Sequence, residues 1–347
     1  MNPGLSKVGV VRKFAAIVLA AAFLVSVGAC SDLPAQAENC TPASTPGAAS
    51  ESVTAAGKFG GNPDAKVPTP IKATRVETSI DKTGSGLLLG PDDVALVQYS
   101  IYDGSTGSLL GTTGQGGFAI TKALTSTVGA KADPIGRYLT CVHTGSRTVT
   151  VETATQFLGS AAAVQQAGLA SNLTLVVVSD VVRGYRGRAT GVLQPVQPDF
   201  PSVVTSSNGT PGFTFDLQTA PKTLKYEVLR KGSGQKTKAG DALLLQVQGV
   251  AWTNPAATTT FDSTWTTHAP RYYPLKALQP NGDASTGATV YSLDPGSVKA
   301  LTGQTVGSQI LVVVPPKYGY PSGKAPAGYP TGTLVFVYDI LGVLPTS

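Results

Sequence analysis

The feature that most constrains this chain is an ordered set of motifs that occurs twice. Each copy has a Gly-Ser-Gly triplet, then a Gly-Ser pair before a β-rich run, and finally a Thr-Leu-Val run that ends in Asp. These motifs fall at 84–86, 145–146 and 174–180 in the first copy, and at 232–234, 307–308 and 333–339 in the second. Their shared order predicts two homologous domains.

The β-rich runs have the alternation of antiparallel strands. In the closing run of the second copy, Leu334, Phe336 and Tyr338 fall on one face, and the intervening residues fall on the other. The 40 Gly and 25 Pro of the 347 residues supply turns for many short strands, and long helical periodicity is absent. In the second copy a short helix is predicted at 295–301, because Pro stands at its start and Gly303 follows its end.

The N-terminal segment predicts export. Lys7, Arg12 and Lys13 precede an apolar run at 14–27. That run is shorter than the about 20 residues that a membrane-spanning helix needs, so 1–29 is interpreted as a signal peptide. The small residues before Cys30 resemble the lipobox of bacterial lipoproteins, which implies a lipid on Cys30 and an extracytoplasmic, membrane-anchored protein. An ordinary secretory signal with a chance cysteine is the alternative.

Lipidation of Cys30 leaves Cys40 and Cys141. Paired cysteines outside the cytoplasm tend to oxidise, so a Cys40–Cys141 disulfide is one hypothesis and two ordinary thiols are the other. Residues 31–57, rich in Ala, Ser, Thr, Pro and Gly, are expected to form a tether without packing of its own, and 194–221 is interpreted as the linker and entry arm. The expected organisation is a signal peptide, a lipidated tether, a first domain, a linker with the arm that leads into the second domain, and the second domain, at 1–29, 30–60, 61–190, 191–221 and 222–347.

Composition and charge exclude several classes of function. Hydrophobic residues make up 41% of the chain, which excludes wholesale disorder. The formal charge is +6, but there is no Lys/Arg run or basic stripe with aromatic residues, so nucleic acid is not an expected partner. His143 and His268 lack a nucleophile-elbow context, and 2 His with 3 Cys predict no metal or cofactor.

Five pieces of the second copy occur in a family's order. They are Gly-Asp, Phe-Asp-Ser, Val-Gly-Ser, Pro-Pro-Lys-Tyr-Gly-Tyr and Thr-Leu-Val-Phe, at 240–241, 261–263, 306–308, 315–320 and 333–336. Residues 222–344 thereby resemble the FKBP-type peptidyl-prolyl cis-trans isomerases. The resemblance implies an α+β fold of two tandem FKBP-like domains, the first eroded. Each would be an antiparallel half-barrel sheet wrapped around a short helix, with a proline pocket between them.

The resemblance also implies roles for five residues. Phe261 would be a pocket wall, Asp262 a polar rim group, and Phe336 part of the inner wall. Tyr320 would donate its hydroxyl to the peptide carbonyl, and Tyr318 would support that loop. Each has a plainer alternative, since the Phe side chains could be core residues, Asp262 a turn cap, and the Tyr side chains loop packing.

Such a pocket needs no nucleophile or metal. Rotation about an X–Pro bond breaks amide resonance, over a barrier of about 18–20 kcal/mol that takes about 10–100 s unaided. An apolar aromatic cup removes water from the amide and favours its twisted form.

The second copy departs from the family at the pocket floor. Ser297 replaces the usual aromatic residue, Asp294 stands where an apolar residue is expected, and Val247 replaces a pocket Tyr. Leu293 is expected to contact substrate beside them. The candidates to refill the cup are Trp265, Tyr272 and Tyr273. Each lost apolar side chain removes about 1.5–3 kcal/mol of burial, so weak turnover is expected.

Two functions therefore stay open. The first is an exported, monomeric isomerase that acts in the second domain on proline-containing segments of secreted proteins. The second is a lipid-anchored FKBP-fold binding or chaperone protein with little or no activity. The first copy retains Tyr99 but has Leu110-Gly111 and Val177 in place of the other pocket residues, so it is expected to bind or to scaffold.

Overall fold

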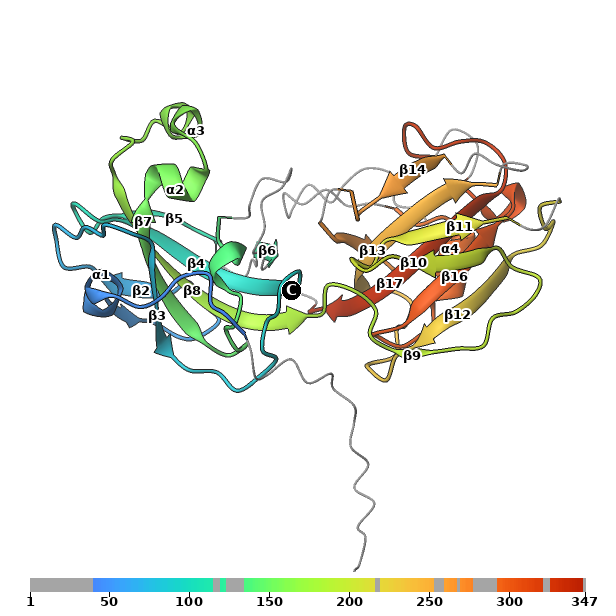
Figure 1. The fold of residues 1–347 in the computed structure, drawn as a ribbon, viewed down its shortest axis with the longest axis horizontal. Coiled ribbons are helices and arrows are strands. Elements are labelled where there is room, and N and C mark those ends of the chain that lie inside the picture. Colours follow the sequence, from blue (N-terminus) through green and yellow to red (C-terminus); the bar gives the residue numbers. More distant parts are fainter. Residues whose placement is uncertain are drawn as a thin grey trace, which may run out of the picture. The chain divides into compact units, whose positions relative to one another are not determined.

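The computed structural model describes residues 40–114, 119–122, 134–215, 219–252, 259–266, 269–276, 292–320 and 325–345 (Figure 1). The expected signal peptide and Cys30 lie outside the described residues. Residues 37–347 form one compact unit. Within the part of the chain that is described, no helix has the length and apolar character needed to cross a membrane.

Two antiparallel sheets have the same strand order. The six-stranded sheet runs β3-β7-β8-β4-β5, with β6 also paired to β4. Its strands are β3 (Glu77–Lys82), β4 (Val94–Asp103), β5 (Leu109–Thr112), β6 (Ala119–Lys122), β7 (Arg147–Thr153) and β8 (Thr174–Tyr185).

The seven-stranded sheet runs β9-β12-β16-β17-β13-β14, with β15 also paired to β13. Its strands are β9 (Val192–Leu193), β12 (Lys225–Lys231), β13 (Ala242–Ala251), β14 (Thr260–Ser263), β15 (Arg271–Pro274), β16 (Gln309–Val314) and β17 (Leu334–Leu344). Apart from β9, each strand has a counterpart in the first sheet, in the order of the repeated motifs. The mostly antiparallel strands and few short helices agree with the expected α+β class.

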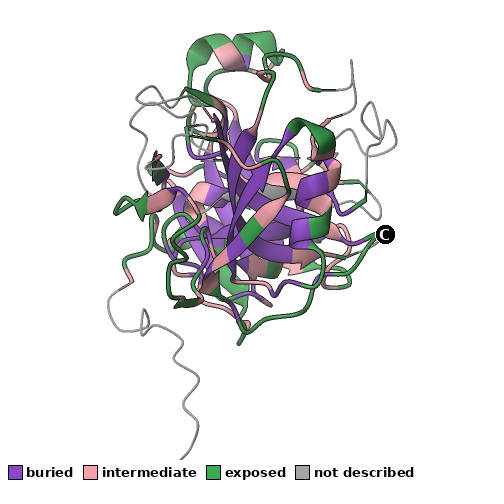
Figure 2. Ribbon diagram, turned by 90° about the vertical axis from the view of Figure 1, so that its right-hand side faces the viewer, coloured by how far each residue is buried: buried purple, intermediate pink, exposed green. Residues whose placement is uncertain are grey.

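The short helix of the second copy lies where the sequence predicts it. Helix α4 (Pro295–Leu301) begins at Asp294, whose side chain accepts a hydrogen bond from the Ser297 N–H at 2.8 Å. Ala300 and Leu301 are fully buried in a core cluster with residues of β13, β16 and β17. The sheet and α4 therefore enclose the main core of this half, and the buried residues gather in the strands (Figure 2).

The first copy differs around its own sheet. A short 3-10 helix, η1 (Gly136–Tyr138), stands in place of α4. Two helices that the sequence did not predict, α2 (Ala154–Leu158) and α3 (Ala161–Gln166), follow β7. Val164 of α3 and Leu175 of β8 are buried in one apolar cluster, which packs these helices against the sheet. In the second copy the same place is taken by η2 (Pro316–Tyr318) and its loop.

The expectation that the tether lacks packing is wrong for its described residues. Helix α1 (Ala48–Ser52) and the hairpin of β1 (Thr54–Ala56) and β2 (Asp64–Lys66) bury Val53 and its neighbours against the first sheet. The hairpin of β10 (Ser202–Thr205) and β11 (Pro211–Thr214) packs Val203 and Phe213 against the second. Each arm covers the outer face of the sheet that follows it, because that face is apolar and needs a cover.

The first arm is also held covalently. Cys40 and Cys141 form a disulfide with a Cα–Cα distance of 5.6 Å. Glu77 of β3 accepts hydrogen bonds from the Ala49 and Ser50 N–H groups at 2.9 and 3.1 Å, which fixes the start of α1. The N-terminal arm is thus part of the folded unit from Cys40 onward.

Candidate functional site

An aromatic cup lies at one end of the second core. It consists of Phe261 from β14, Phe336 from β17, and Tyr320 and Tyr329 from the loop between β16 and β17. Phe261 meets the Phe336 ring edge-on at 5.6 Å and the Tyr329 ring at 4.7 Å. Tyr320 meets Tyr329 edge-on at 5.5 Å. Phe336 is buried and the other three are half-buried, so the four rings, called the aromatic cup below, form an apolar cluster that is partly exposed.

A glycine makes room for the base of the cup. Gly249 of β13 stands opposite Phe336 on one side and opposite Asp262 on the other. A Cβ atom at this position would lie 3.0 Å from both the Phe261 and the Phe336 ring. The edge-to-face pair therefore depends on Gly249 having no side chain.

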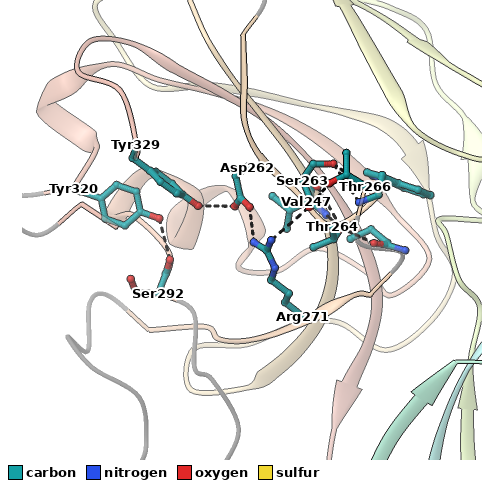
Figure 3. Close-up of polar contacts among 11 residues, drawn as sticks. Val247, Asp262, Ser263, Thr264, Thr266, Arg271, Ser292, Tyr320 and Tyr329 are labelled. Atoms are coloured by element: carbon teal, nitrogen blue, oxygen red, sulfur yellow. Dashed lines mark hydrogen bonds and ion pairs between the residues drawn. The ribbon is translucent and has the colours of Figure 1, made fainter. Parts of the chain in front are cut away.

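The polar rim is built around Asp262. One carboxylate oxygen is paired with the Arg271 guanidinium, and the other accepts the Tyr329 hydroxyl at 2.5 Å (Figure 3). Burial, with the negative charge of Asp262, raises the pKa of Tyr329, so this phenol stays protonated. Because both oxygens are held, Asp262 is fixed in orientation beside Phe261.

The hydroxyl of Tyr320 is engaged within the chain. It donates to the Ser292 carbonyl at 2.9 Å, and burial raises the pKa of Tyr320 (Figure 3). A substrate carbonyl that accepted a hydrogen bond from the Tyr320 hydroxyl would have to replace the carbonyl of Ser292. Tyr318 lies in η2, half-buried against the same core, in a position to support the loop.

A buried polar chain forms the floor where the family has an aromatic residue. The Tyr338 hydroxyl donates to Ser297 Oγ at 2.9 Å, and Ser297 Oγ donates to Asp294 at 2.6 Å. All three residues are at most 1% exposed, and burial raises the pKa of Asp294 to about 6. The Tyr338 ring stacks on Phe336 at 5.3 Å and faces Val247 across the strand pair. Tyr338 thus supplies aromatic surface next to the position where Val247 is small.

The other residues that the sequence named fall in two places. Val247, Leu293 and Tyr273 are buried in the same core cluster as the cup. Trp265 is not in that cluster and packs instead on Gly209 in the β10–β11 turn, where a Cβ atom would lie 2.6 Å from its ring. Of the candidates to refill the cup, Tyr273 alone lies in the cluster among the residues described.

Sequence reasoning missed Arg271, Tyr329 and Tyr338. Tyr338 was visible as the next residue on the face of Phe336. Tyr329 and Asp262 are 67 positions apart, so no local pattern pairs them. Arg271 lies just before two Tyr residues in a run that carries no motif.

The first sheet holds a different arrangement at the equivalent place. Arg137 pairs with Glu152 at 2.8 Å, and the Tyr138 hydroxyl donates to the same Glu152 oxygen at 3.2 Å. Burial raises the pKa of Glu152 to about 7. Tyr99 and Val177 lie in the adjoining apolar cluster. A buried ion pair has therefore replaced an aromatic cup.

The chain is similar to several solved structures of FKBP proteins. No family model and no curated protein matches the chain. Among solved structures, it is similar to FkpA from Escherichia coli at 26% identity and a TM-score of 0.27, covering 41% of this chain and 52% of FkpA. The chain thus spans about half the length of FkpA.

Two further structures are similar. The three FKBP domains of wheat FKBP73 match at 14% identity and a TM-score of 0.29, over 78% of this chain and 94% of that one. AtFKBP13 matches at 15% identity and a TM-score of 0.26, over 37% and 98%. In the described residues, no group of three or more His, Cys, Asp or Glu could hold a metal ion.

Proposed function

We propose that residues 222–347 act as an FKBP-type peptidyl-prolyl cis-trans isomerase. The observation that carries this proposal is the aromatic cup, with Phe261 and Phe336 edge-to-face at 5.6 Å above a sheet that wraps a short helix. A proline ring is apolar and lacks a donor, so an aromatic wall suits it. The polar rim at Asp262 places a fixed dipole beside the peptide backbone next to the bound proline.

The proposed mechanism is selective desolvation. The planar X–Pro amide is well hydrated, and the twisted amide is less polar because its resonance is broken. An apolar cup binds the twisted form better, which lowers the barrier without a covalent step. The hydrogen-bond donor to the peptide carbonyl is the Tyr320 hydroxyl, after it leaves the carbonyl of Ser292, which now accepts it at 2.9 Å.

A second function, binding without turnover, is favoured by a separate observation. The Tyr320 hydroxyl already has an acceptor in the chain, and the floor is the polar Asp294–Ser297–Tyr338 chain instead of one aromatic ring. A cup of this kind would hold a proline-containing segment and leave its barrier unchanged.

A protease-coupled assay on a Pro-containing peptide separates the two functions, with the full chain kept soluble in mild detergent. We expect weak acceleration of the slow phase, and a loss of at least about tenfold in Phe261→Ala, which removes the apolar wall. Tyr99→Phe in the first sheet is the matched control and should keep the rate. Equal rates with and without protein would contradict the isomerase proposal and favour binding without turnover.

We propose further that the chain is an exported lipoprotein of two tandem FKBP-like domains, monomeric, and anchored through Cys30. The Cys40–Cys141 disulfide supports an oxidising compartment. Its partners would be the membrane and proline-containing segments of exported proteins. Metabolic labelling with an alkynyl fatty acid should mark the chain, and Cys30→Ser should abolish the label. A label that survives this change would refute the anchor.

A further inference from the structure

A pocket outside the aromatic cup lies along β12, next to the part of this strand that the short edge strand β9 does not cover. Its volume is about 540 Å³, within the range of about 300–1,000 Å³ that ligand sites occupy. Residues 194–198, Gln-Pro-Val-Gln-Pro, form one wall. Tyr226, Glu227 and Val228 of β12 form the other.

The pocket lies where the ladder between β9 and β12 ends. β9 pairs with β12 at Arg230 and Lys231, and the Gln194 N–H extends the ladder to the Leu229 carbonyl at 2.9 Å. An antiparallel ladder bonds every second residue, so the next donor would be the Val196 N–H, and the Gln197 N–H bonds the Glu227 side chain instead of the β12 backbone. The chain therefore leaves β12 and a gap follows. Among the described strands, the pairing of β9 with β12 goes no further than Arg230.

Glu227 places an unused acceptor in this gap. The residue is 5% exposed. Its Oε2 accepts the Gln197 N–H at 3.2 Å, while Oε1 is buried and has no hydrogen-bond partner. Burial raises the pKa of Glu227. The neighbouring cation, Lys225, is engaged by Asp199 at 3.2 Å. A buried acceptor without a donor is costly, so a donor brought by a ligand would be favourable.

The mouth of the pocket is apolar. Val196 and Tyr226, which line it, are 68% and 43% exposed. Val192 and Leu193 of the adjoining β9 are also exposed. Apolar side chains gathered beside a pocket are typical of a site that a partner covers.

We infer that this pocket binds an extended peptide segment that runs along the free edge of β12 and places one Arg or Lys side chain against Glu227. The edge strand offers main-chain pairing, the mode by which extended peptides add to sheets. The carboxylate offers a charge-assisted hydrogen bond to that cationic side chain. This site is independent of the proposed isomerase cup.

Two labelled pentapeptides test the inference, of sequence Thr-Val-Arg-Val-Thr and with citrulline, the neutral analogue, in place of Arg. Fluorescence anisotropy with the full chain in detergent should give the Arg peptide at least about tenfold tighter binding. Glu227→Gln should abolish that preference. Glu51→Gln, which changes an exposed acid of the first copy in the same way, is the matched control and should change either affinity by less than about twofold.

A second variant tests the inference independently of any effect of Glu227→Gln on folding. Val196 is exposed, so Val196→Trp fills the pocket without entering the core, and it should weaken both peptides. Equal affinity for the two peptides, no binding of either, or a preference that survives Glu227→Gln would overturn the inference. Free argininamide binding as tightly as the Arg pentapeptide would overturn the pairing with β12.

Discussion

At the scale of single residues, the floor of the cup is where this chain departs most from its family resemblance. Asp294 has two tasks, because it accepts from the N-terminus of α4 and from Ser297 Oγ, which in turn holds Tyr338. An apolar residue at this position would leave the start of the helix without its cap. Asp294, Ser297 and Tyr338 therefore bond to one another. The polar floor is a set of three mutually dependent residues, and more than the loss of one aromatic side chain.

The raised pKa of Asp294 predicts a pH-dependent contribution to stability. Burial raises this pKa to about 6 from 3.8, so the folded state binds the proton more tightly than the unfolded state. The contribution is present below about pH 4 and is lost as the pH rises through about 6. Asp294→Asn removes the titration. Between pH 4 and 7, wild type should lose about 2–3 kcal/mol relative to the variant.

Urea unfolding of both proteins at several pH values in this window measures the effect. Asp339 has a similarly raised pKa of about 6, but it is present in both proteins and cancels in the comparison. Parallel pH profiles would contradict the assignment of the titration to Asp294.

The same residues mark the limit of what the sequence could predict about the site. Phe261, Asp262, Tyr320 and Phe336 came from ordered motifs, and the structure places them together. Tyr329 did not, because its bond to Asp262 joins strands and loops that meet only in the fold. The acceptor of the Tyr320 hydroxyl is a backbone carbonyl, which no side-chain pattern indicates.

At the scale of elements, alternation and end signals predicted the strands and α4, but the two arms escaped prediction. An arm rich in Pro, Gly and Ser has a loop composition, and its apolar residues gain a partner only once a sheet offers an outer face. Phe215 shows this, because its ring meets Trp252 beyond the end of β13 at 4.9 Å. The structure of these segments is therefore determined by packing between residues that are far apart in the sequence.

The β10–β11 arm is therefore expected to contribute to stability. Phe215→Ala should lower the free energy of unfolding by about 1–3 kcal/mol, less than a fully buried Phe because the ring is half-buried. Val204→Ala, in the same hairpin and 70% exposed, is the control and should change it by under about 0.5 kcal/mol. Urea unfolding followed by Trp fluorescence reports both. An unchanged midpoint for Phe215→Ala would mean that the arm does not stabilise the sheet.

At the scale of the whole molecule, the repeat includes more than the motifs indicated. Each copy has an arm hairpin, a sheet with one strand order, and a buried Asp on the last long strand that holds backbone from the segment before it. Asp180 accepts from Gly60 N–H at 2.7 Å, and Asp339 accepts from Ala189 N–H at 2.7 Å. The copies differ in what they add, since the disulfide belongs to the first and the aromatic cup to the second.

That asymmetry gives a test of the tandem-domain proposal. The disulfide closes a loop with a sequence separation of 101, so its reduction should cost the first sheet about 2–5 kcal/mol. Both Trp residues of the chain, Trp252 and Trp265, belong to the second copy. Reduction should therefore lower the urea midpoint seen by far-UV circular dichroism more than the midpoint seen by Trp fluorescence. Cys40→Ser with Cys141→Ser should reproduce the shift without reductant. Equal shifts in the two signals would mean that the sheets unfold as one unit, which would contradict two separately stable domains.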